Sequence, residues 1–243
     1  MYRLLSEADR PGFALAFESM SGFLSEGRAA GLVTIENVVG AAEAIPVTVE
    51  DAEIEVVDGA GKAIGHYWFG RLELRPKNLV RTPDGSVHLE VPFPDGWPYP
   101  HAQAIWSRWR RGSILPGEWT RYPAAQHGDW LHVVQNAWFF SGKRAMRYNT
   151  GDIVIDGQGL SSEDSFYCAL GEAANGPGGH FGSNLDALDD CLRSEPASTP
   201  RYPVVWHAAA ESRRTLGDAF VEAVAEVFAD HRIELHERES AVQ

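Results

Sequence analysis

Residues 152–243 alternate between short apolar runs and longer segments whose apolar side chains recur at helical spacing. The short runs are typical of buried strands and cover residues 152–156, 202–206 and 232–237. The helical segments cover residues 161–174, 184–193 and 212–231, and the glycine-rich stretch 175–183 between the first two predicts a loop. This order of elements predicts a small α/β domain with a mostly parallel three-stranded sheet packed by helices.

Residues 1–150 instead show the period-two alternation that is typical of strands. Residues 46–74 alternate on both sides of the turn signal Asp58-Gly59-Ala60-Gly61, which predicts a hairpin. Residues 82–93 predict another turn and strand, and residues 129–140 predict a further extended run. Residues 101–112 favour a short helix with one apolar face, formed by Ala102, Ile105, Trp106 and Trp109. We therefore expect a mainly-β or α+β domain here, of unknown role.

A change in composition near residue 150 predicts the boundary between these two domains, 1–150 and 151–243. Seven of the eight tryptophans precede it, and only Trp206 follows. Of the net charge of −13, residues 152–243 carry −11, from 17 acidic and six basic residues. So acidic a surface repels nucleic acid and attracts basic partners over a long range. The arginines and tryptophans of residues 101–112 could stack on single strands, but interleaved tryptophan is more typical of a core.

Composition also bears on where the protein acts. The contents of 44% hydrophobic and 23% charged residues are those of a globular protein. No apolar run approaches the 18 residues of a membrane span, and the N-terminus does not have the pattern of a signal peptide. With Cys168 and Cys191 as the two cysteines, and no CxxC pair, we expect a cytoplasmic protein with buried free thiols.

The segment "NLDALDDCLR" (184–193) concentrates like charges on one short helix. Asp186 and Asp190 lie one turn apart, with Asp189 beside them, on the face opposite the apolar stripe of Leu185, Leu188 and Leu192. Like charges at this spacing destabilise an isolated helix by about 0.2–0.5 kcal/mol per pair. Asn184 is a plausible N-cap, and the helix N-terminus partly offsets the cost at Asp186. Such a face is suited to accept hydrogen bonds from Arg, Lys or His⁺ groups of another molecule.

The string "HFGSNLDALDDCL" (180–192) also carries a resemblance, with "DIVIDG" before it and "YPVVW" after it. Over residues 152–238 the chain is similar to the barstar family, protein inhibitors of ribonucleases. The resemblance implies a non-enzymatic binding module, of the immunity or antitoxin type, whose acidic helix and glycine-rich loop block a cationic active site by imitating phosphates. It implies no cofactor and no metal, and a basic ribonuclease or RNase toxin as partner.

The resemblance also assigns partner-binding residues. Asp190 matches the aspartate that enters the phosphate pocket, and Asp186 matches a second acidic contact. Further matched positions are Asn184, Gly182, Phe181, His180 and, late in the third helix, Asp230, with Glu226 as the neighbouring alternative. His180 and Phe181 fall where the family has two tyrosines, and Asp189 falls where it has a tryptophan. These departures favour a related ribonuclease or RNase toxin as much as barnase.

Two other functions are compatible with the same residues. The acidic domain could bind a basic protein that is not a nuclease. Asp186 and Asp190 could also form a metal site or an acid–base pair of a hydrolase. Against the hydrolase, no histidine or third carboxylate is placed by the sequence to complete such a site, and His66, His101, His127 and His132 lack metal-ligand spacing.

Overall fold

The computed structural model describes residues 1–6, 14–24, 31–39, 48–74, 79–81, 87–93, 98–196 and 200–239. Contacts divide the chain into two compact units, Met1–Ser113 and Ile114–Gln243. This division falls before the boundary expected near residue 150, because residues after Ser113 form helices that pack with the second unit. No helix among the described residues has the length and apolar character needed to cross a membrane.

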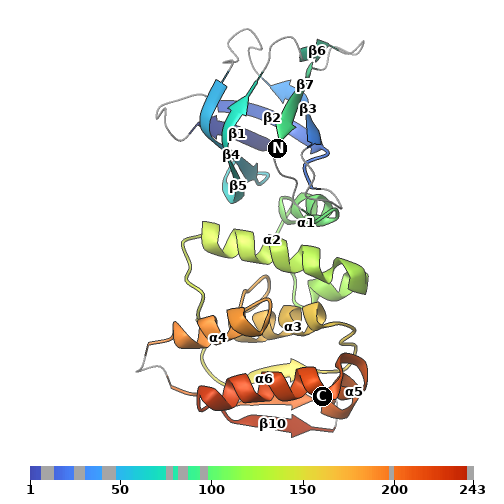
Figure 1. Ribbon diagram of the computed structural model, residues 1–243, viewed down its shortest axis with the longest axis vertical. Coiled ribbons are helices and arrows are strands. Elements are labelled where there is room, and N and C mark those ends of the chain that lie inside the picture. The colour runs from blue at the N-terminus through green and yellow to red at the C-terminus, as the bar shows by residue number, and fades with distance from the viewer. Residues whose placement is uncertain are drawn as a thin grey trace. The chain divides into compact units, whose positions relative to one another are not determined.

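The first unit contains a seven-stranded antiparallel sheet with the strand order β5-β4-β1-β2-β3-β7-β6 (Figure 1). Its strands are β1 (Tyr2–Ser6), β2 (Ala14–Ser21), β3 (Gly31–Val39), β4 (Thr48–Val57), β5 (Ala63–Glu73), β6 (Leu79–Arg81) and β7 (Val87–Phe93). The predicted hairpin over residues 46–74 is confirmed as β4 and β5. The strand predicted within residues 82–93 is β7, whereas the turn before it lies outside the described residues.

The helix predicted near residue 101 is α1 (Ala102–Trp109), and its four predicted apolar side chains are buried. The Trp106 Nε1 donates a hydrogen bond to the hydroxyl of Tyr67, 2.7 Å away on β5. Gln103 Nε2 donates to the carbonyl of Met20 at 2.8 Å. The tryptophans of this helix therefore serve the core of the first unit rather than an exposed stacking surface.

The second unit holds the predicted three-stranded parallel sheet, and its strand order is β10-β9-β8. Its strands are β8 (Ile153–Asp156), β9 (Val204–His207) and β10 (Leu235–Arg238). Helix α3 (Glu163–Asn175) packs on β8, α4 (Leu185–Arg193) packs beside α6 (Asp218–Asp230), and α6 contacts β10 (Figure 1). The core centres on Trp206, which is fully buried and stacks on Phe166 with ring centroids 4.8 Å apart.

The extended run predicted over residues 129–140 is wrong, because this segment is helix α2 (His127–Phe140). It is preceded by two short 3-10 helices, η3 (Glu118–Arg121) and η4 (Ala124–Gln126). Its β-branched and aromatic residues favour strands only weakly, and tertiary contacts override that preference. Trp130, Val134 and Trp138 recur every four residues and are buried, and the helix packs against α3.

The single helix predicted over residues 212–231 is also wrong. The segment forms two helices, α5 (Ala209–Leu216) and α6, separated at Gly217. Gly217 has a φ of 89°, in the left-handed region that glycine tolerates and that ends a right-handed helix. The buried apolar side chains of this segment, among them Phe220, Val224 and Phe228, all belong to α6, whereas Leu216 before the break is only half-buried.

Candidate functional site

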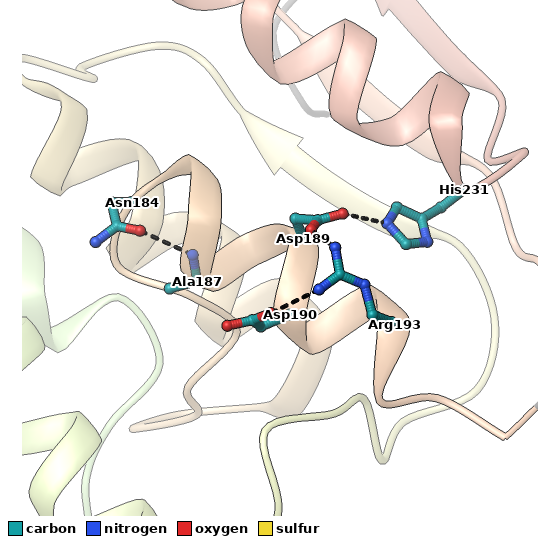
Figure 2. Close-up of polar contacts among 6 residues, drawn as sticks. All are labelled: Asn184, Ala187, Asp189, Asp190, Arg193 and His231. Carbon is teal, nitrogen blue, oxygen red and sulfur yellow. Dashed lines mark hydrogen bonds and ion pairs between the residues drawn. The ribbon is translucent and has the colours of Figure 1, made fainter.

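The acidic helix α4 forms as predicted and is anchored by one buried face. Asn184 is its N-cap: its side-chain oxygen accepts a hydrogen bond from the Ala187 N–H at 2.8 Å (Figure 2). Leu188, Cys191 and Leu192 are buried beneath it, whereas Leu185, expected in the same stripe, is only half-buried. A nine-residue helix is marginal by itself, so this buried face and the cap must hold it in place.

The turn into α4 requires glycine at position 182. Gly182 has a φ of 93°, and a Cβ built there would lie 2.9 Å from both the backbone N and the Cα of Leu188. Real Cβ atoms do not approach backbone atoms so closely, so any larger residue would push the loop away from the helix. The predicted site residue Gly182 thus sets how the loop meets α4, whether or not it also contacts a partner.

Residues 146–148, which precede β8, hold the other end of the glycine-rich loop. The Asn175 side chain accepts a hydrogen bond from the Tyr148 N–H at 2.7 Å. It donates to the carbonyl of Met146 at 3.2 Å and to the carbonyl of His180 at 2.7 Å. One amide group therefore ties the end of α3 and the loop to a segment that the sequence placed in the first domain.

The side chains of His180 and Phe181, two of the predicted contact residues, lie in the interior. Phe181 is fully buried, and His180 is 2% exposed. The His180 ring packs edge-on against Phe139 of α2, with ring centroids 5.4 Å apart. Burial lowers the pKa of His180 to about 4, so the ring is neutral at pH 7. Neither side chain offers surface to a partner in this conformation, and their predicted role as contacts stays a prediction.

Asp186 and Asp190 lie on the exposed face of α4, as the helical spacing predicts. Among the residues that the structure describes, Asp186 has no hydrogen bond or ion pair through its carboxylate. The Asp190 side chain is 69% exposed, and its Oδ1 lies 3.1 Å from Nη1 of Arg193. The two aspartates are four positions apart, which is about 6 Å along the helix axis. They present negative charge to solvent on a helix whose opposite face is fixed.

Asp189 differs from these two, because side chains of its own chain, His231 and Arg193, pair with both of its carboxylate oxygens. Its Oδ1 accepts a hydrogen bond from Nε2 of His231 at 2.6 Å, and its Oδ2 pairs with Nη2 of Arg193 (Figure 2). The hydrogen bond from His231 and the charge of Arg193 lower the pKa of Asp189. Since His231 follows directly after α6, Asp189 ties the acidic helix to the end of that helix.

The same hydrogen bond places Asp230, the last residue of α6, in the neighbourhood of α4. Asp230 is exposed and precedes His231, which touches Asp189. Glu226, the alternative position, is exposed one turn earlier in α6. Helix α6 therefore places Asp230 next to the residue that contacts α4, and the assignment of Asp230 or Glu226 as a partner contact stays a prediction.

Sequence reasoning missed Arg193 and His231. The spacing contained a signal for Arg193, which lies three and four residues after Asp190 and Asp189. No local pattern marks His231, because it lies 42 positions from Asp189 and meets it only through the packing of α4 beside α6.

No group of three or more His, Cys, Asp and Glu side chains among the described residues is arranged to hold a metal ion. Cys168 and Cys191 are free and buried, as expected. Burial raises the pKa of Cys191 to about 12 and that of Cys168 well above its usual range, so both thiols are protonated at pH 7.

Comparison with known proteins identifies the C-terminal region. Residues 151–243 match the family described as Barstar (barnase inhibitor), and this region of the chain is a Barstar domain. The three strands of the parallel sheet and helices α3 to α6 all lie within the matched residues. Residues 1–150 lie outside the match, and their assignment as a separate domain stays a prediction. No curated protein matches the chain.

Proposed function

We propose that this protein inhibits a ribonuclease, acting as an immunity protein or antitoxin whose α4 blocks the cationic active site of the enzyme. The observation that supports this proposal is the pair of exposed carboxylates, Asp186 and Asp190, on one face of a helix that belongs to a Barstar domain. The family description names inhibition of barnase, a ribonuclease.

The electrostatic argument starts from the enzyme. A ribonuclease binds phosphates, and Arg, Lys and His donors in a concave pocket serve that purpose. Carboxylates one turn apart on α4 present acceptors to the same donors without offering a bond to cleave. Most of the net charge of −13 lies in this unit, which accelerates encounter with a basic enzyme at low salt.

The rigidity of the site supports binding rather than turnover. Asn184 caps α4, and Leu188, Cys191 and Leu192 fix its other face. The carboxylates are therefore held before the partner arrives, which reduces the entropy lost on binding. With His180 and Phe181 buried and Asp189 engaged by His231, the acidic contacts rest on Asp186 and Asp190, with Asp230 beside them.

The test measures inhibition of RNA cleavage with the full chain. Barnase and a panel of small basic microbial ribonucleases are titrated with the protein, and cleavage of a fluorogenic RNA is followed. We expect stoichiometric inhibition of at least one enzyme. Binding to an enzyme of the panel without loss of cleavage would instead favour the non-inhibitory interaction module, and no effect on any of them would refute the proposal.

Asp190→Asn tests the assigned contact, with Glu222→Gln as a control that removes the same charge. Glu222 is exposed on α6, more than two turns before His231. Breaking a desolvated charge pair costs about 2–5 kcal/mol, a range to which measurements on barnase–barstar itself contribute. We expect a loss of this size for Asp190→Asn and little change for Glu222→Gln. Equal effects would show that only net charge matters.

A further inference from the structure

Arg193, the last residue of α4, pairs with two aspartates of the same helix. Its Nη1 lies 3.1 Å from Oδ1 of Asp190, and its Nη2 pairs with Oδ2 of Asp189 (Figure 2). Among the described residues, no other hydrogen bond or ion pair reaches the Asp190 carboxylate. Asp190, which is proposed to enter a cationic pocket, therefore already pairs with the guanidinium of Arg193.

In a complex, Asp190 cannot pair with Arg193 and with the cationic donors of a ribonuclease at the same time. A phosphate pocket offers Asp190 several cationic donors, and Arg193 on the same carboxylate would bring a like charge among them. Such a charge in a desolvated site is strongly unfavourable. Binding through Asp190 therefore requires the Arg193 guanidinium to move away.

Arg193 can keep its ion pair with Asp189 after it has left Asp190. Asp189 accepts a hydrogen bond from His231 through one oxygen and pairs with Arg193 through the other, so it can keep both partners while Asp190 is released. The Arg193 side chain is 67% exposed, so it can turn away from Asp190 without disturbing buried groups.

We infer that Arg193 is an intramolecular competitor for Asp190, displaced onto Asp189 when a ribonuclease binds, and that it lowers the affinity for any partner that binds through Asp190. The inference rests on the proposed function and adds a residue that sets the affinity of the site. Displacing Arg193 costs every partner that uses Asp190 the same free energy, so all such affinities fall by the same factor. A pocket with several cationic donors still binds tightly after this loss, whereas a surface with a single cation is left with a weak affinity.

The test compares Arg193→Gln with Arg214→Gln in the full chain, using the ribonuclease of the panel that the wild type binds most tightly. Arg214 is exposed on α5 and, among the described residues, forms no hydrogen bond or ion pair, so both variants lose one positive charge. An exposed ion pair shifts an equilibrium by about 1.4- to 5-fold. We expect Arg193→Gln to bind more tightly than Arg214→Gln by such a factor, and Arg193→Lys to stay near the wild type.

The same comparison in an Asp190→Asn background isolates the pairing. There, Arg193→Gln should bind no more tightly than Arg214→Gln, because the contested carboxylate is gone. If Arg193→Gln weakens binding, or equals Arg214→Gln in the wild-type background, the competitor role is refuted while inhibition itself stands. If the wild type inhibits no ribonuclease, the proposed function fails first, and the inference fails with it.

Discussion

Gly182 offers a sharp test of how the loop positions the acidic helix. With a φ of 93°, it adopts a conformation that costs an L-residue about 1–2 kcal/mol. A Cβ at this position would also lie 2.9 Å from backbone atoms of Leu188, and forcing extra atoms into a packed site costs about 1–3 kcal/mol. We therefore expect Gly182→Ala to lower the free energy of unfolding of the C-terminal unit by about 2–5 kcal/mol.

Gly159 provides the matched control, since it has a φ of 80° but no atom within 4 Å of a Cβ built on it. Gly159→Ala should show only the conformational cost, about 1–2 kcal/mol. The difference between the two variants therefore measures the contact with Leu188 alone.

The two compact units can unfold separately, so a single global transition would not report on the correct one. Hydrogen exchange read on peptides from α4 and β9 follows the second unit directly. Equal destabilisation by Gly182→Ala and Gly159→Ala would refute the close approach to Leu188. Inhibition of a ribonuclease, measured where Gly182→Ala is still folded, should also weaken because α4 is displaced.

Three further predictions concern the same unit. Asn184→Ala removes the cap of α4 and should lower the free energy of unfolding by about 0.5–2 kcal/mol, measured by denaturant titration. His180 is buried neutral with a pKa of about 4, below its unfolded value of about 6.5. Its contribution to stability is therefore complete above pH 6.5 and falls with decreasing pH toward 4, by up to about 3 kcal/mol, and His180→Asn should flatten this slope. Cys168 and Cys191 should resist alkylation at pH 8 until the unit unfolds; rapid labelling of the native protein would contradict their burial.

Much of the second unit could be predicted because its signals are local. The capping residue Asn184, the leucines of α4 and the apolar strands each act within a few positions, so pattern alone identifies them. Asp186 and Asp190 were placed on an exposed face by the same helical spacing.

The two wrong predictions of secondary structure arose where residue composition and hydrophobic spacing favour different elements. The segment that forms α2 is rich in aromatic and β-branched residues, which favour a strand by composition but are buried here at helical spacing against α3. The break at Gly217 was missed because the apolar residues of α6 recur at helical spacing, and this pattern was extended back through residues 212–217.

The acidic face of α4, its cap and the parallel α/β order follow from local sequence pattern, because helical and strand periodicity are properties of neighbouring residues. Which of the acidic side chains pair with distant parts of the chain depends instead on how the helices pack in three dimensions. His231 reaches Asp189 from 42 positions away, and Asn175 joins the loop to the segment before β8. Such contacts depend on how distant elements pack, and side-chain spacing along the chain does not encode them.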